Sequence, residues 1–181
     1  LCIAQPGEIL LLVGPSRVGK SRATQEAGRQ LLGSTEPNGR AHAFVYLELQ
    51  NAGISSFFST KSFTADLLHT VQHPIYGVPA PDDPFGQKLD TRLNKTPETT
   101  LRTAFERACD ARGIRYLALD EFHHITHVKG GARAQAAILD SWKCLAAKKG
   151  LVLILIGPYN LLQTVALSSH LIGRTRLVEF P

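Results

Sequence analysis

The chain has no methionine, one tryptophan and only three cysteines among its 181 residues. The cysteines, Cys2, Cys109 and Cys144, are odd in number and form no C-x-x-C pair, so nothing indicates a disulfide framework or a redox motif. We expect them to be small buried side chains in a reducing compartment.

Long apolar runs are also missing, and the longest, residues 151–156, has the length of one strand. A membrane-spanning helix needs roughly 18–20 apolar residues, and the start of the chain has no secretory leader. We therefore expect a cytoplasmic protein that does not contact membranes. Because the chain starts on Leu1 and stops abruptly at Pro181, we also expect a fragment of a longer protein.

The composition, 44% apolar and 19% charged, is typical of one globular domain with a single core. Its net charge of +5 is unevenly distributed along the chain. Residues 1–100 carry nine Lys and Arg against nine Asp and Glu, whereas residues 101–181 carry eleven against six. A basic second half permits contact with nucleic acid but does not require it, because many surface cations only interact with solvent.

Apolar strand-like runs alternate with amphipathic segments, which predicts a mainly parallel sheet covered by helices. The alternation predicts strands at 9–13, 43–49, 116–119, 151–156 and 177–180. Helices are expected at 20–32, where Ala23, Ala27 and Leu31 are spaced by four, at 63–71, 97–112 and 160–166, and from the end of a Gly-Gly loop at 130–131 to residue 149. Residues 73–97 contain five of the ten prolines and predict a long surface loop.

The sequence GPSRVGKS follows the first predicted strand and fits G-x-x-x-x-G-K-[ST] in full. In this motif the glycines let backbone N–H groups point at phosphate oxygens, the lysine reaches the β- and γ-phosphates, and the hydroxyl ligates Mg²⁺. The helix that follows adds its positive N-terminal end. We therefore expect ATP to bind at Gly14, Pro15, Ser16, Arg17, Val18, Gly19, Lys20, Ser21 and Arg22, with Ser21 also a magnesium ligand.

Two adjacent carboxylates follow the third predicted strand in the stretch LALDEFHHITH. A phosphate loop needs a carboxylate at the end of a neighbouring strand to hold Mg²⁺, and Asp120 stands there. Glu121 is then placed to polarise a water molecule for attack on the γ-phosphate. This pair favours an ATP hydrolase over a small-molecule kinase, which activates a substrate hydroxyl and does not need the second carboxylate.

The three histidines of the same stretch suggest an alternative, a transition-metal site. His123 and His127 stand four residues apart and could chelate zinc on one helical face with Glu121 nearby. H-x-x-x-H without a glutamate inside it is a weak pattern, however, and Mg²⁺ does not prefer imidazole. We therefore expect packing, capping or interface roles for the histidines.

Taken together, these segments resemble the AAA+ ATPases, and within them the TniB/TnsC-type regulators of transposition. The resemblance rests on ILLLVGPSRVGKSRA, AFVYLEL, LALDEFHHI, ILDSWKCLAAKKGLVLILIGPYNLL and HLIGRTRLVEFP. It implies a three-layer αβα sandwich around a five-stranded sheet, in which the first strand is flanked by the fourth. It also implies an ATP- and Mg²⁺-dependent homo-oligomer that assembles on DNA and communicates with a transposase.

The resemblance also assigns further catalytic roles. Arg174 corresponds best to the arginine finger that enters the site of a neighbouring subunit, with Arg176 as the alternative. Asn160 is the nearest candidate for the water-positioning sensor residue, although Gly157 is followed here by Pro158 rather than by a polar residue. Residues 1–181 then form one core domain, and the lid and N-terminal regions of the family are absent.

Two other functions remain open at this point. Nucleotide could gate a DNA-binding scaffold in which hydrolysis serves only for disassembly. The chain could also be another ATPase of the same superfamily, such as a helicase loader or a secretion-associated or signalling ATPase.

Overall fold

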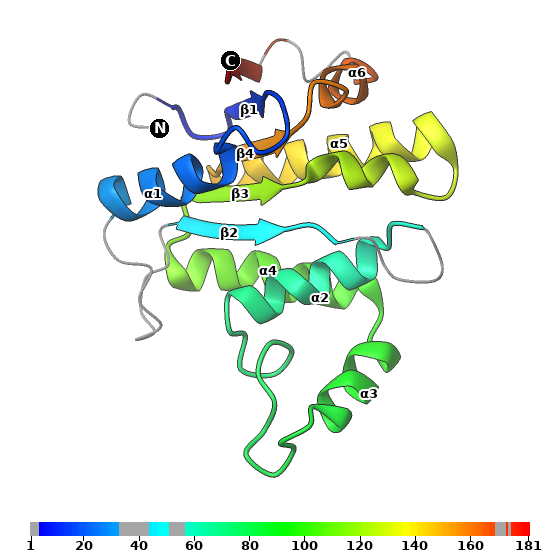
Figure 1. Cartoon of the computed structure of the whole chain (residues 1–181). Coiled ribbons are helices and arrows are strands. Elements are labelled where there is room, and N and C mark those ends of the chain that lie inside the picture. Colours follow the sequence, from blue (N-terminus) through cyan, green and yellow to red (C-terminus); the bar gives the residue numbers. More distant parts are fainter. Residues whose placement is uncertain (1–3, 33–43, 51–56, 169–172, 174) are drawn as a thin grey trace.

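The computed structural model describes residues 4–32, 44–50, 57–168, 173 and 175–181. Five strands alternate with helices, as Figure 1 shows. The strands are β1 (Ile9–Val13), β2 (Phe44–Glu48), β3 (Tyr116–Asp120), β4 (Val152–Gly157) and β5 (Thr175–Glu179). The helices are α1 (Lys20–Leu32), α2 (Thr60–Thr70), α3 (Gln87–Lys95), α4 (Glu98–Arg112), the 3₁₀ helix η2 (Phe122–His127), α5 (Gly131–Lys149) and α6 (Leu161–Ala166).

The strands form one sheet in the order β2-β3-β4-β1-β5, and every neighbouring pair is parallel. Because helical connections return the chain to the same edge each time, all strands end at one edge of the sheet. The predicted α/β fold with a five-stranded sheet is confirmed, and so is the position of β4 beside β1. The strand boundaries differ from the predicted ones by one or two residues.

One face of the sheet carries the larger core. Helices α2, α4, α5 and α6 pack against this face, and Figure 1 shows α2 and α4 lying side by side. Phe63, Phe105 and Trp142 meet at its centre, with ring centroids 5.0 Å apart for the pair Phe63–Trp142. Burying one side chain of this size contributes about 1.5–3 kcal/mol, so this face supplies much of the stability of the domain.

The opposite face is covered by α1, and its core is smaller. Helix α1 approaches closely because Gly28 lies against the ring of Phe44, which a Cβ at that position would meet at 2.5 Å. Over residues 20–30 of the helix, Lys20, Thr24 and Gly28 are buried, while Ala23 is exposed. The helix was predicted correctly, but the expected apolar side through Ala23 was wrong, because close packing on Phe44 selects the glycine side.

The segment between α2 and α4 is not a loop throughout, which corrects the prediction for residues 73–97. It contains α3, and Figure 1 shows this segment projecting away from the sheet. Asp83 fixes the start of the helix, since its carboxylate accepts a hydrogen bond of 3.0 Å from the N–H of the buried Leu89. No proline lies between Pro84 and Pro97, which leaves residues 87–95 free to form a helix.

The cysteines differ from one another. Cys109 is buried, and burial raises the pKa of its thiol to about 12, as expected for an inert core residue. Cys144 is exposed on α5, two residues after the buried Trp142, so the expectation of burial was wrong for it. Cys2 lies outside the described residues.

Among the described residues, no helix has the length and apolar character needed to cross a lipid bilayer.

Candidate functional site

The carboxyl edge of the sheet brings together segments that are far apart in the sequence. Val13 pairs with Gly157, and Leu119 pairs with Leu155 on the other side of β4. The loop after β1, the carboxylates after β3 and the turn after β4 therefore leave the sheet at nearly the same level. In open parallel sheets this edge is where ligands bind.

The loop after β1 is shaped by two glycines that have different roles. A Cβ at Gly14 would lie 2.6 Å from the carbonyl oxygen of Phe180, so only glycine allows this approach to the end of β5. Gly19 has φ +97° and open space around it, so its requirement is conformational. Arg17 also has a positive φ of 64°, a conformation that turns the loop back toward α1.

The side chain of Lys20 lies over this loop. Its ammonium group donates hydrogen bonds to the carbonyl oxygens of Gly14 at 3.0 Å and Pro15 at 2.6 Å. Lys20 is only 9% exposed, and no carboxylate of the described residues forms an ion pair with it. A nearly buried cation that is paired only with carbonyl dipoles favours an anion beside it.

The other predicted loop residues differ in exposure. Residues 15–19 and Arg22 are exposed, and Ser21 is half-buried at the start of α1. The loop thus presents backbone to solvent at the N-terminal end of a helix, which is the usual setting for a bound phosphate.

A partly buried polar cluster links Ser21 to Asp120 through Tyr46, a residue of β2. The hydroxyl group of Tyr46 donates a hydrogen bond to Oδ2 of Asp120, and the N–H of Glu121 donates to Oδ1 at 2.7 Å. Burial, followed by the hydrogen bond to Asp120, raises the pKa of Tyr46 to about 12, and hydrogen bonds from Gln25 and Ser21 act in the opposite direction. The two predicted magnesium ligands therefore both contact one phenol.

Tyr46 was not among the predicted site residues. It stands in the strand AFVYLEL, where an aromatic residue is ordinary. The register of β2 against β3 gives it its place, because Tyr46 pairs with Ala118 and so lies diagonal to Asp120 on the same face of the sheet.

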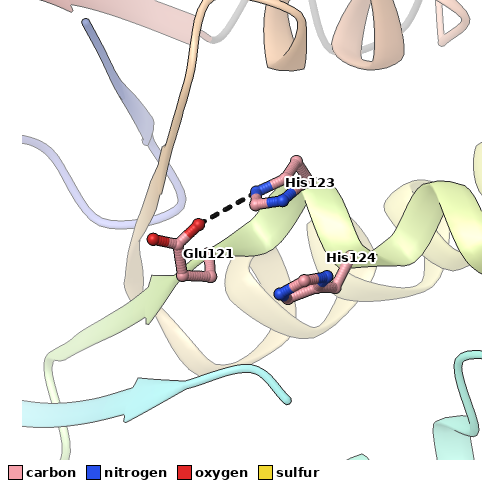
Figure 2. Close-up of side chains that lie close together, drawn as sticks. All are labelled: Glu121, His123 and His124. Carbon is pink, nitrogen blue, oxygen red and sulfur yellow. Dashed lines mark ion pairs between the residues drawn. The ribbon is translucent and has the colours of Figure 1, made fainter. Parts of the chain in front are cut away.

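Glu121 has a strained backbone and an accessible carboxylate. Its φ of 50° lies in the left-handed region, which a residue with a Cβ adopts at a cost of roughly 1–2 kcal/mol. Its side chain is 44% exposed, and Oε2 lies 3.1 Å from Nδ1 of His123 (Figure 2). Non-glycine residues in this conformation occur preferentially at functional sites.

The histidines lie on a 3₁₀ helix rather than on an α-helix. The rings of His123 and His124 have centroids 4.3 Å apart, and His127 is exposed with its ring 6.1 Å from that of His124. Burial, and then the neighbouring His123, lowers the pKa of the His124 imidazole, which favours its neutral form. The alternative that was disfavoured above, a pairing of His123 with His127 on one α-helical face, is therefore not found.

The residues predicted from the family resemblance do not all lie at the carboxyl edge of the sheet. Asn160 is exposed and precedes α6, three residues beyond the end of β4 at the same edge of the sheet. Arg176 forms an ion pair of 3.0 Å with Glu8 of its own chain. This pair lies near the N-terminal ends of β5 and β1, at the other edge of the sheet from the phosphate loop. Arg174 lies outside the described residues.

Known proteins resemble this chain in sequence and in fold. The family model described as "AAA domain" matches residues 4–165. The Walker-type ATPase of Pyrococcus abyssi has a similar fold, with a TM-score of 0.58 and 16% identity over 94% of this chain and 48% of that chain. The structure of Drosophila ORC bound to AT-rich DNA and Cdc6 gives a TM-score of 0.52 and 10% identity over 96% of this chain and 25% of that chain.

A search of curated proteins found no match. In the two structural comparisons, the chain spans about half the length of the Pyrococcus protein and a quarter of the Drosophila chain. Since the AAA family model covers most of the chain and the fold agrees with that of a Walker-type ATPase, the chain belongs to the AAA family of P-loop ATPases.

Proposed function

We propose that this domain binds ATP with Mg²⁺ and hydrolyses it to ADP and phosphate at the carboxyl edge of the sheet. The observation that carries the proposal is the cluster Ser21–Tyr46–Asp120 beside the nearly buried ammonium group of Lys20. The candidate oxygen ligands for magnesium, from α1 and β3, are linked there through a phenol of β2, and the cation proposed for phosphate precedes Ser21 in α1.

Asp120 and Ser21 are the proposed magnesium ligands. A carboxylate and a hydroxyl are the hard oxygen donors that Mg²⁺ prefers, and Asp120 is held in place by Tyr46 and by the N–H of Glu121. When bound, Mg²⁺ would neutralise charge on the β- and γ-phosphates.

The loop from Gly14 to Arg22 is the proposed phosphate cradle. Lys20 leaves its carbonyl partners, or keeps one of them, and places its charge against the phosphates. Pro15, Ser16, Arg17, Val18 and Gly19 contribute through the loop backbone, and the N-terminal end of α1 adds to the attraction.

Glu121 is the proposed general base. Its carboxylate accepts a proton from a water molecule whose oxygen forms a bond to the γ-phosphorus, while the bond from that phosphorus to the bridging oxygen of ADP breaks. The contact with His123 orients the carboxylate before the reaction. Asn160 is proposed to position the water, and Arg174 is proposed to stabilise the phosphoryl charge in a neighbouring subunit.

The finer proposal is that a cytoplasmic homo-oligomer of this protein assembles on DNA and directs target choice by a transposase. Support comes from the resemblance to TniB/TnsC-type regulators, from the basic second half of the chain, and from the fold shared with the Drosophila ORC chain solved with DNA. Ion pairs with acidic residues engage part of this basic charge, as for Lys148 with Glu106 and Lys149 with Asp110. The DNA contact would therefore use other cations, such as the exposed Arg107 and Arg133.

The test of hydrolysis is phosphate release from ATP by the protein and by Lys20→Ala. We expect the substitution to weaken ATP binding and to lower turnover by about 100-fold or more, because it removes a charge that contacts the transferred phosphoryl group. Lys88→Ala is the matched control, since Lys88 is exposed on α3 and pairs with Asp82 there. Turnover that survives Lys20→Ala would contradict the proposal.

The DNA part is tested by titrating the protein with duplex DNA at increasing salt, with and without ATP. Binding that tightens with ATP and weakens steeply with salt is expected for phosphate contacts. Binding that does not depend on nucleotide would contradict the coupling.

The second candidate function is a nucleotide-gated scaffold, in which hydrolysis only disassembles the oligomer. Blocking the proposed base with Glu121→Gln separates the two functions. A scaffold stays assembled on DNA with ATP and remains competent to recruit its partner, whereas a protein that needs turnover assembles and then stalls. Sedimentation with DNA and a transposition assay are the two measurements.

A further inference from the structure

Three side chains next to the proposed magnesium site form a second, separate group of ligand atoms. One ligand atom each of Glu121, His123 and His124 lies within 4.8 Å of the other two, and Figure 2 shows the three side chains converging in front of η2. The group follows from local backbone geometry. The N–H of His124 donates a hydrogen bond of 3.0 Å to the carbonyl oxygen of Glu121, which closes the first 3₁₀ turn and keeps the two residues close together.

Two ring nitrogens of the group have unused bonding capacity. The Nδ1 atoms of His123 and His124 are buried, and neither has a hydrogen-bond partner among the described residues. The Nδ1 atom of His123 contacts Glu121 Oε2 at 3.1 Å without an aligned hydrogen bond. A buried polar atom without a partner costs about 1–3 kcal/mol, and a ligand that binds both nitrogens would remove this cost.

The spacing of the three atoms suits a small metal ion. Ligands at about 2.1 Å from a tetrahedral zinc ion are about 3.4 Å apart. The distance of 3.1 Å between His123 and Glu121 is already close to this value, and the third ligand atom lies within 4.8 Å. Rotation of the Glu121 side chain, which is 44% exposed, can supply the remaining shift.

The chemistry of the ligands separates this group from the magnesium site. Two imidazole nitrogens and one carboxylate oxygen are typical ligands of zinc and related transition metals, whereas Mg²⁺ selects oxygen. Three protein ligands also leave a fourth position open to water.

We infer that Glu121, His123 and His124 bind a borderline transition-metal ion such as Zn²⁺, and that this binding withdraws Glu121 from ATP hydrolysis. The second half of the inference rests on the proposed function, because it needs Glu121 to be the base. The first half does not, since it concerns binding to the protein without nucleotide.

Binding is tested on the nucleotide-free protein with Co²⁺ as the spectroscopic probe. We expect one equivalent of Co²⁺ to give the intense visible absorption of a tetrahedral site, and Zn²⁺ to displace it because zinc binds such ligands more tightly than cobalt. Weak absorption typical of hydrated Co²⁺, with no saturation at one equivalent, would overturn the inference.

The ligands are assigned by comparing His124→Ala with His127→Ala. His124→Ala removes a ligand and should weaken Co²⁺ binding at least about tenfold. His127→Ala removes an exposed imidazole of the same stretch outside the group, and should change binding by no more than about twofold. Equal losses in both variants would show that the histidines bind metal nonspecifically and would overturn the site.

His124→Asn and Glu121→Gln keep the assignment testable if His124→Ala does not fold. Both retain side-chain bulk and polarity, and each should weaken Co²⁺ binding at least about tenfold. Retained binding in both would overturn the site, whatever the state of the alanine variant.

The effect on hydrolysis is measured last, at fixed free Zn²⁺ set by a metal buffer and with Mg²⁺ in excess. Zn²⁺ should lower turnover of the unmodified protein at the concentration that displaces Co²⁺, and His124→Asn should need at least about tenfold more. Binding without inhibition would overturn the second half alone. If the protein has no turnover at all, the proposed function fails, while the Co²⁺ titration still decides the metal site.

Discussion

Asp120 and Glu121 are adjacent carboxylates with opposite surroundings. Asp120 is the last residue of β3 and is only 3% exposed, and both of its carboxylate oxygens accept hydrogen bonds. Glu121 is outside the strand, has a left-handed backbone and presents an accessible carboxylate beside an imidazole. Two adjacent residues thus carry a fixed carboxylate and a more accessible one, which suits their proposed roles as magnesium ligand and general base.

The largest effect is expected for Asp120→Asn. This substitution keeps the shape but removes the charge proposed to hold Mg²⁺, so turnover should fall by about 100-fold or more. It also weakens the charge-assisted hydrogen bond from Tyr46, which should lower the free energy of unfolding by about 1–2 kcal/mol. Phosphate release and urea unfolding measure the two effects.

Asp110→Asn is the control for that experiment, since Asp110 is an exposed partner of Lys149. It should change the free energy of unfolding by less than about 0.5 kcal/mol and leave turnover unchanged. If Asp120→Asn behaves like this control, Asp120 is not the magnesium ligand.

Glu121→Gln should affect activity without affecting stability. Removal of a general base lowers turnover by about 10²–10⁴-fold. Because the side chain is half-exposed, the free energy of unfolding should stay within about 0.5 kcal/mol of the original value. ATP affinity, measured by calorimetry with Mg²⁺, should be retained, and a parallel loss of affinity would place Glu121 in ATP binding instead.

Glu121→Gly should stabilise the domain while it abolishes the base. Glycine relieves the strain of φ 50°, and we expect the free energy of unfolding to rise by about 0.5–1 kcal/mol after the greater flexibility of the unfolded chain is counted. Glu121→Ala is the matched control, because it also lacks the carboxylate but keeps the Cβ. Thermal or urea unfolding of the pair isolates backbone strain, and equal stability would show that the turn stores none.

The smallest effect concerns Tyr46. Its pKa of about 12 lies above the ordinary value of about 10, so the folded state favours the neutral phenol. The stability from this group is fully present below pH 10 and is lost as the pH rises from about 10 to 12. The phenolate absorbance of the protein minus that of Tyr46→Phe should show a midpoint near pH 12, and a midpoint near 10 would mean that neither burial nor the contact with Asp120 stabilises the neutral phenol.

The parts of the site that consist of short sequence motifs were predictable from the sequence. GPSRVGKS and the Asp-Glu pair each follow a buried apolar strand, and the ends of parallel strands meet at one edge, so their proximity follows from pattern alone. The strands and most helices were predictable for the same reason. Helix α3 was missed because its start depends on a contact between Asp83 and Leu89 that the proline-rich composition conceals.

The roles of Tyr46 and of the histidines were not predictable. Tyr46 reaches Asp120 only through the register of β2 against β3, which is set by burial over the whole sheet. The histidine spacing indicated an α-helical pair, but the chain turns sharply at Glu121 into a 3₁₀ helix and groups His124 with Glu121 instead. The sequence of six residues does not decide between a 3₁₀ helix, with three residues per turn, and an α-helix, with 3.6. The packing around the segment decides it.

The sequence by itself therefore determined the class of the protein, because a phosphate loop and a strand-end carboxylate are local patterns with a fixed chemical purpose. Only the tertiary structure decided how each polar group is used. It buried Asp120 against a phenol from another strand and left the carboxylate of Glu121 accessible, in contact with one of two unsatisfied imidazoles. The physical reason is that the hydrogen bonds of a polar group and the strain of its backbone depend on the residues around it in space. Strand register and turn conformation determine which residues these are.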